Sequence, residues 1–254
     1  VPEYDPEAHG VDVVVKSVPN VPNTDWLEVY YDGQDYTEAS DFTAVNGVLD
    51  KAGADNHGSQ TGGVGFDTEY KAFTFDGSTT QHIRGTMPTT VVHTVGCWFK
   101  MLDTGATHVI FAAGAAVSRQ TTGIFIDSSS KLRVYFYDND FIYSTITTNT
   151  WYHICYSYSG GVLSHSTVKT YLNGTEIMGT RSVSSEGALN LTNFNFSING
   201  DNVGAYITEP SHVANFRVFN RVLSSDEIYQ LYAYQKEYFG HGVLGMTLKA
   251  GRLG

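Results

Sequence analysis

Short stretches in which apolar and polar residues alternate recur along most of the chain. A period of two residues is typical of a β-strand with one buried face. Two turn signals separate such stretches: Asn173-Gly174, because a type I′ hairpin needs positive φ at both residues, and Gly160-Gly161. This pattern favours a two-sheet sandwich over alternating strands and helices. It predicts strands at residues 26–31, 70–75, 81–84, 91–101, 108–112, 123–127, 131–137, 142–145, 151–158, 168–172, 194–198 and 214–219.

A change of period near the C-terminus predicts a helix. Residues 213–219 alternate as a strand, and apolar residues from Ile228 onward follow at helical spacing. Ser224 or Ser225 stands where an N-cap belongs, and Ser224-x-x-Glu227 has the spacing of a capping box. We therefore expect a strand that leads into one short helix at the end of a β-rich chain.

The residues of this closing element carry a family resemblance. The run A-N-F-R-V-F-N-R-V-L-S-S-D-E-I at 214–228 resembles the last strand and helix of concanavalin A-like, or laminin-G-like, jelly rolls. Further segments resemble the family's opening and central strands in the family's order, at residues 50–58, 62–66, 72–78, 96–100, 151–156 and 171–174. The resemblance implies an all-β fold: a two-sheet antiparallel jelly-roll β-sandwich (concanavalin A-like) with one short C-terminal helix.

The sequence predicts three regions. Residues 1–25 hold four of the six prolines, which favours an N-terminal linker or extension. Residues 26–236 form the predicted jelly-roll domain. The Gly-rich residues 237–254 are predicted to be a C-terminal β extension that leads to a fibrous module.

The C-terminal region also suggests a biological setting. Residues 247–254 resemble the start of a repeat in viral tail-fibre and spike proteins, and residues 228–254 look like lectin-like domains of structural proteins from large algal DNA viruses and phages. This resemblance implies a homotrimer within a larger fibre or capsid protein, displayed on the virion surface or extracellularly.

Charge narrows the range of partners. The formal net charge of −11 argues against nucleic acid and anionic membranes, because binding either needs clustered Lys and Arg. No apolar run is long enough to predict membrane insertion. Cys97 and Cys155 each fall in a predicted core strand, so they are either two small buried apolar residues or a cross-strand disulfide.

Two kinds of polysaccharide cleavage can be compared with the chain. Glucanases of the family carry alternating carboxylates on one strand, and Glu3, Asp5 and Glu7 have that spacing, but Pro6 and the N-terminal position argue against a working strand. A lyase needs a cation to neutralise a uronate and a His or Tyr to move a proton. His82 and Arg84 share one strand face and are the candidates, although a solvated strand face explains them as well.

Carbohydrate binding needs aromatic surfaces flanked by planar polar groups. Alternation in the strand at 131–137 places Arg133, Tyr135 and Tyr137 on one face and turns the residues between them, Leu132, Val134 and Phe136, toward the core. Aromatic residues also favour strands without any ligand, so a purely structural role stays open. The predicted glycan-binding residues are Arg133, Tyr135, Tyr137, Asp138, Asp140, Tyr143 and His153.

Calcium is the cofactor that the resemblance implies, held by loop oxygens. The candidate ligands form two groups: Asp138, Asn139 and Asp140 in one, and Asp76 with Asn199, Asp201 and Asn202 in the other. The first hypothesis for function is a non-catalytic carbohydrate-binding or adhesion module of a viral fibre or capsid-associated protein that recognises host cell-surface glycans. The alternatives are a glycoside hydrolase or lyase that degrades the host cell wall, and a structural spacer.

Overall fold

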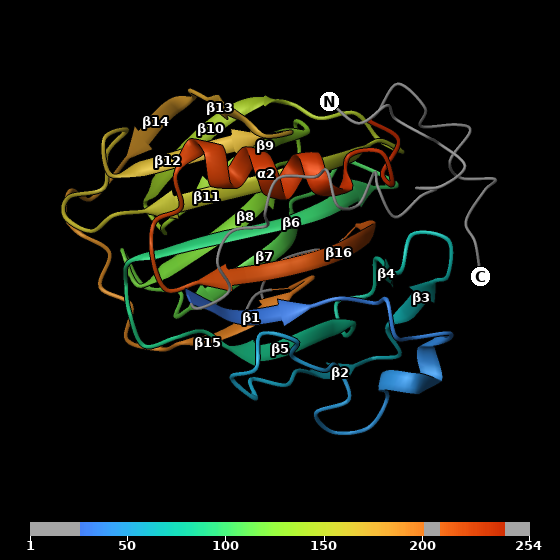
Figure 1. The fold of residues 1–254 in the computed structure, drawn as a ribbon. Coiled ribbons are helices and arrows are strands. Elements are labelled where there is room, and N and C mark those ends of the chain that lie inside the picture. Colours follow the sequence, from blue (N-terminus) through green and yellow to red (C-terminus); the bar gives the residue numbers. More distant parts are fainter. Residues whose placement is uncertain (1–25, 201–208, 242–254) are drawn as a thin grey trace, which may run out of the picture.

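The computed structural model describes residues 26–200 and 209–241. Within these ranges two antiparallel eight-stranded sheets face each other (Figure 1). The front sheet comprises β13 (Thr175–Ile177), β12 (Val168–Leu172), β11 (Trp151–Tyr158), β6 (His93–Met101), β16 (Pro210–Phe219), β4 (Ala72–Asp76), β3 (Gly65–Asp67) and β1 (Leu27–Tyr31). The back sheet comprises β14 (Thr180–Val183), β10 (Asn139–Thr145), β9 (Lys131–Tyr135), β8 (Thr121–Ile126), β7 (His108–Gly114), β15 (Asn195–Ile198), β5 (His82–Thr86) and β2 (Ser59–Thr61).

Strand β16 organises the front sheet. It pairs with β6 along one edge, while β4 and β1 share its other edge end to end. A β-bulge interrupts the β16–β6 register between Ala214 and Arg217, and Asn215 within it adopts a left-handed φ of 52°. The predicted jelly-roll sandwich is confirmed, as is the Asn173-Gly174 hairpin, whose φ angles are 52° and 77°.

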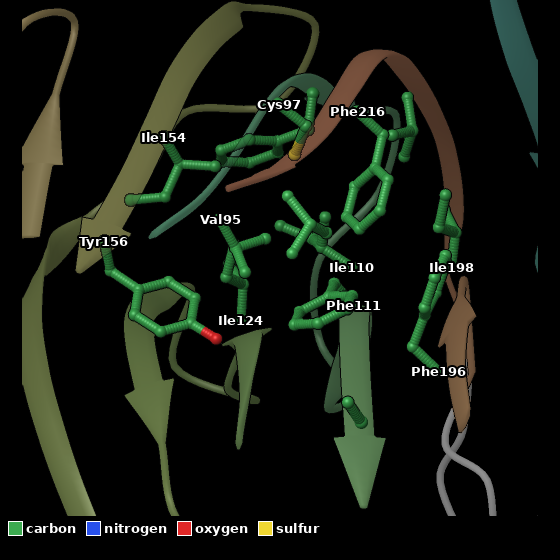
Figure 2. Packing of buried hydrophobic residues seen from close by; sticks show 14 of the residues in the cluster. Val95, Cys97, Ile110, Phe111, Ile124, Ile154, Tyr156, Phe196, Ile198 and Phe216 are labelled. Atoms are coloured by element: carbon green, nitrogen blue, oxygen red, sulfur yellow. The ribbon is translucent and has the colours of Figure 1, made fainter. Parts of the chain in front are cut away.

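The core lies between the two sheets. Figure 2 shows Val95, Ile154 and Phe216 of the front sheet with Phe111 and Ile198 of the back sheet, and all five are at most 1% exposed. Their positions follow the period-two alternation, since every second residue of a strand points inward. Burial of these side chains is the main contribution that holds the sheets together.

The predicted helix is α2 (Ser225–Gln235), and it packs on the outer face of the front sheet (Figure 1). Both hydrogen bonds of the capping box form: Glu227 N donates to Ser224 Oγ at 3.3 Å, and Ser224 N donates to Glu227 Oε2 at 2.8 Å. Ile228 and Leu231 are buried against Phe219 and its neighbours. Among the described residues no helix is long and apolar enough to cross a membrane.

Arg217 lies on the outer face of the closing strand β16 and contacts Tyr30 of β1. Its guanidinium stacks 4.2 Å from the centre of the Tyr30 ring, and its Nη2 donates to Tyr30 Oη at 2.9 Å. Gln235, at the end of α2, accepts from Trp98 Nε1 at 3.1 Å. Arg217 is 5% exposed, so it is a structural residue that ties β1 to β16 beneath the helix.

Several short elements of the fold are absent from the sequence-based predictions. The short strands β2, β3 and β14 and a 3-10 helix, η2 (Ala39–Phe42), have too few residues to show a period.

The two cysteines are free, because Cys97 points into the core whereas Cys155 points to the outer face under α2. Adjacent strands place them near each other, but alternation turns them to opposite sides of the sheet.

Candidate functional site

Part of the predicted glycan-binding strip gathers on the outer face of the back sheet. Leu132, Val134 and Phe136 are fully buried in the core, which leaves Arg133 and Tyr135 of β9 on the other face. Asp140 of β10 lies directly opposite Tyr135 in the register. Alternation therefore placed these residues correctly, and cross-strand pairing brings them together.

Arg133 is the centre of this group. Its Nε and Nη2 donate to Asp127 Oδ2 at 2.9 and 2.6 Å, and its Nη1 donates to Asp140 Oδ2 at 2.9 Å. Asp127 also accepts at Oδ1 from the backbone N–H groups of Ser129 and Lys131, at 2.8 and 3.0 Å. The guanidinium is thus fixed between two carboxylates on neighbouring strands and cannot rotate freely.

The two carboxylates sit in different environments. Burial raises the pKa of Asp127, but backbone and Arg133 hydrogen bonds outweigh it, and the net shift is downward. Burial raises the pKa of Asp140, and the opposing effect of Arg133 does not cancel it. Asp140 Oδ1 is buried and has no hydrogen-bond partner among the described residues. An acceptor at the site therefore stays unsatisfied.

Aromatic rings lie beside the charged group. The Tyr135 ring is 4.7 Å from Phe125 and 5.7 Å from Tyr137, measured between centroids. Strand β9 ends at Tyr135, and Tyr137 has a left-handed φ of 43°, yet its ring still contacts the strip. A surface pocket of ≈ 240 Å³ is lined by Thr107, Phe125, Asp127, Ser128, Arg133, Tyr135 and Asp140.

The predicted site lacks four pocket residues, Thr107, Ser128, Phe125 and Asp127, of which Phe125 contributes a ring and Asp127 a carboxylate. Both belong to the predicted strand at 123–127, where alternation with buried Ile124 and Ile126 puts them on the outer face. The periodic signal for them was therefore present. What the sequence lacked was the order of strands, which sets β8 beside β9.

Tyr143 and His153 lie away from the pocket, and for both the predicted position is wrong. Tyr143 points into the core, where its hydroxyl donates to Thr170 Oγ1 at 2.7 Å. His153 belongs to the front sheet and packs under α2, with its ring 5.3 Å from Trp98 and 6.1 Å from Tyr232. Burial lowers the pKa of His153 to about 3. Tyr143 lies on the face of β10 opposite to that of Asp140, and strand order decides the sheet to which His153 belongs.

The candidate calcium ligands do not converge among the described residues. Asp138 is exposed, and Asp140 is held by Arg133. Asn139 is buried, with its amide bonded to Arg181 and to the carbonyl of Ser185. In the part of the chain that the structure describes, no group of three or more His, Cys, Asp or Glu residues could hold a metal ion.

The second calcium group is only partly described. Asp76 accepts from the backbone N–H of Ser78 at 2.7 Å, and Asn199 donates to the carbonyl of Gln81 at 2.7 Å. Both contacts are typical of turns and buried amides. Asp201 and Asn202 lie outside the described residues.

The candidate catalytic residues fall in two places. Glu3, Asp5 and Glu7 lie outside the described residues. His82 and Arg84 belong to β5 and share one face of the back sheet, as predicted. Burial, and then the charge of Arg84, lower the pKa of His82.

Comparison with solved structures supports the fold. The receptor-binding domain of the botulinum neurotoxin C/D mosaic serotype is 15% identical, with a TM-score of 0.63, over 85% of this chain and 55% of that one. A Trypanosoma rangeli sialidase in complex with sialic acid is 14% identical, with a TM-score of 0.60, over 87% of this chain and 34% of that one. The chain thus spans about half of the toxin domain and a third of the sialidase.

Sequence comparison identifies the family. A search of curated proteins finds no match. Residues 74–229, which include the pocket-forming strands β8, β9 and β10 and the closing strand β16, match the model of the concanavalin A-like lectin/glucanases superfamily. The chain therefore belongs to the concanavalin A-like lectin/glucanases superfamily.

Proposed function

We propose that this domain binds a glycan, without cleaving it, in the pocket beside Tyr135 on the back sheet. The observation that carries the proposal is the fixed Arg133–Asp127–Asp140 group next to the Tyr135 and Tyr137 rings. Sugar recognition combines an apolar ring face with planar polar groups that receive and donate hydrogen bonds. The pocket supplies both.

The charge of the pocket favours sugar hydroxyls over acidic groups. One guanidinium stands against two carboxylates, so an anionic ligand would meet an excess of negative charge. We therefore expect a neutral sugar.

The same contacts argue for binding rather than cleavage. Hydrolysis by two carboxylates needs one proton donor and one nucleophile or base. Asp127 and Asp140 are instead both ion-paired with the one guanidinium of Arg133, so neither carboxylate is free to act on a substrate, although burial raises the pKa of Asp140. Two structural neighbours support a glycan as the general class of ligand: cell entry of botulinum neurotoxin type C depends on interaction with two ganglioside molecules, and the sialidase was solved in complex with sialic acid. Because sialic acid is acidic, the expectation of a neutral sugar rests on the charge of the pocket and not on these neighbours.

The biological setting is a further part of the proposal. The resemblance of residues 228–254 to viral lectin-like domains supports an adhesion module of a viral fibre or capsid-associated protein. It would be trimeric, displayed on the virion surface, and directed at host cell-surface glycans. A structural calcium ion, as in many relatives of this fold, remains part of this proposal.

A glycan array followed by calorimetric titration of the best neutral ligand tests the site. Tyr135→Ala should weaken binding by roughly tenfold, as expected for the loss of an aromatic anchor. Tyr234→Ala is the matched control, because Tyr234 is a 44% exposed tyrosine of α2, the helix that covers the front sheet. Titrations with and without a chelator test the calcium proposal, which predicts weaker binding once the ion is removed.

Three results would contradict the proposal. Absence of binding to any sugar on the array removes the lectin function. Equal effects of Tyr135→Ala and Tyr234→Ala place the site elsewhere. Release of reducing sugar or unsaturated uronate from algal cell walls by the protein would establish an enzyme instead of a binding module.

A further inference from the structure

A second hollow lies on the same sheet, at its β5–β2 edge. It has a volume of ≈ 400 Å³, and its polar lining includes Arg84 of β5, Ser59 of β2, Asn195 of β15 and Asn193 just before β15. Arg84 pairs in register with Ser59, and cross-strand partners project on the same face. We refer to this hollow as the Arg84 groove.

The lining of the Arg84 groove contains no carboxylate. The chain carries a formal net charge of −11, so a groove free of Asp and Glu departs from its average surface. The nearby carboxylate of Asp55 is 4.0 Å from His57 Nε2, but its side chain is 93% exposed and is not part of the lining. The local potential is therefore set by Arg84.

Arg84 is exposed and has no ion pair or hydrogen bond from its side chain to any described residue. Three other arginines, Arg133, Arg181 and Arg221, each form an ion pair with a carboxylate. A guanidinium carries five N–H donors in a planar fork that matches a carboxylate. In Arg84 that fork is available to a ligand.

Two asparagines that line the groove use their amide oxygens within the fold. Asn46 Oδ1 accepts from Ser59 Oγ at 3.3 Å, and Asn193 Oδ1 accepts from the backbone N–H of Asn195 at 3.0 Å. The amide groups of Asn46 and Asn193 thus keep their Nδ2 donors for a ligand.

His57 adds another donor of the same kind. Its Nδ1 accepts from the backbone N–H of Asp50 at 2.9 Å. That bond fixes the tautomer of the neutral ring, so the hydrogen is on Nε2. Together with Arg84 and the two amides, it gives the groove N–H donors on four side chains and no carboxylate.

We propose that the Arg84 groove binds a carboxylate-bearing sugar, such as a uronate residue of an acidic polysaccharide. Arg84 forms a bidentate pair with the carboxylate, and the amide donors of Asn46 and Asn193 bind ring and hydroxyl oxygens. The site is separate from the Tyr135 pocket, where two carboxylates oppose an acidic ligand. Either site can exist without the other.

The test is a calorimetric titration of the full chain with a hexamer of galacturonic acid. The carboxyl-reduced hexamer and a sulfated neutral hexamer serve as comparison ligands. We expect the uronate to bind, the reduced hexamer not to bind, and Arg84→Gln to weaken the uronate by roughly 10- to 100-fold, the range for a hydrogen bond to a charged group. Chemical-shift changes on titration should centre on the side-chain amides of Asn46 and Asn193.

Lys131→Gln is the matched control, because Lys131 is an exposed cation on β9 of the same sheet. It should leave uronate affinity within about twofold, since a single distant surface charge contributes little. Equal weakening by both variants would show non-specific charge attraction and overturn the proposal. So would binding of the sulfated hexamer alone, or equal binding of the uronate and its reduced form. Tyr135→Ala should not alter uronate binding, which separates this test from that of the first site.

Discussion

The outer faces of the two sheets carry similar residues with different surroundings. On the front sheet, Trp98, His153 and Arg217 are at most 5% exposed, because α2 covers them. On the back sheet, Arg133 is partly exposed and Arg84 is exposed. The same alternation of aromatic and basic residues therefore serves stability on one face and access to solvent on the other. Residue type alone does not decide between the two roles. What decides is whether a helix such as α2 covers the face of the sheet.

The surroundings of three arginines illustrate this contrast between the two outer faces. Arg217 stacks on Tyr30 and holds the helix side of the fold together, whereas Arg133 is fixed by two carboxylates at a pocket. Arg84 has a groove in front of it and no carboxylate in the lining. Substitutions on the front face should change the free energy of unfolding, and those on the back face should change ligand binding.

The largest effect is expected from Trp98→Ala. The Trp98 ring is 4.3 Å from that of Phe239 and is fully buried, so its removal leaves a large cavity beneath α2. We expect the free energy of unfolding to fall by about 3–5 kcal/mol, measured by urea denaturation. A loss below about 1 kcal/mol would show that the front face is not the structural one.

Acid should destabilise the front face through His153. Burial lowers its pKa to about 3, against about 6.5 in an unfolded chain. Below pH 6.5 the unfolded chain binds a proton that the folded chain does not, so stability falls as the pH drops from 6.5 toward 3, by at most about 1.4 kcal/mol per pH unit. Buried His93 and His108, whose pKa values burial lowers to about 4 and about 3, add to this slope. His153→Gln should flatten the slope in denaturation curves; an unchanged slope would contradict its assignment as a buried neutral ring.

Much of this contrast could be predicted from the sequence, and the limits have a physical cause. Period-two alternation is local, so it identified the inward residues of β9, and the capping box of α2 is local as well. Which strands become neighbours depends on contacts between distant segments, and His153 was misplaced for that reason. Tyr143 was misplaced because it lies on the inward face of β10. The Arg84 groove joins residues from three strands and a loop, so no single segment shows it.

A smaller effect is expected from Ser224→Ala, which removes one half of the capping box of α2. Loss of an N-cap costs about 1 kcal/mol, and the helix that covers the front face should fray at its start. The hydrogen bond from Arg221, followed by those from Ser224, lowers the pKa of Glu227 to about 2 despite burial. This contribution of Glu227 is therefore present above pH 4.5 and is lost as the pH falls toward 2. Ser225→Ala is the control, because the cap bonds form at Ser224; equal losses would contradict the assigned cap.

The smallest effect on stability is expected on the back face, from Tyr137→Asn. Asparagine tolerates the positive φ at this position, so the change removes the ring with little backbone strain. We expect the free energy of unfolding to stay within about 0.5 kcal/mol of the parent, while the affinity for the neutral glycan falls. Tyr232→Ala on α2 should give the opposite pattern, because the Tyr232 ring stacks on Trp98 with 5.7 Å between the centroids. Two results would contradict this division of roles between the faces. One is a loss of stability in Tyr137→Asn, and the other is a loss of glycan affinity in Tyr232→Ala. Either result would show that the front face is not purely structural or that the back face is not free to bind a ligand without a cost in stability.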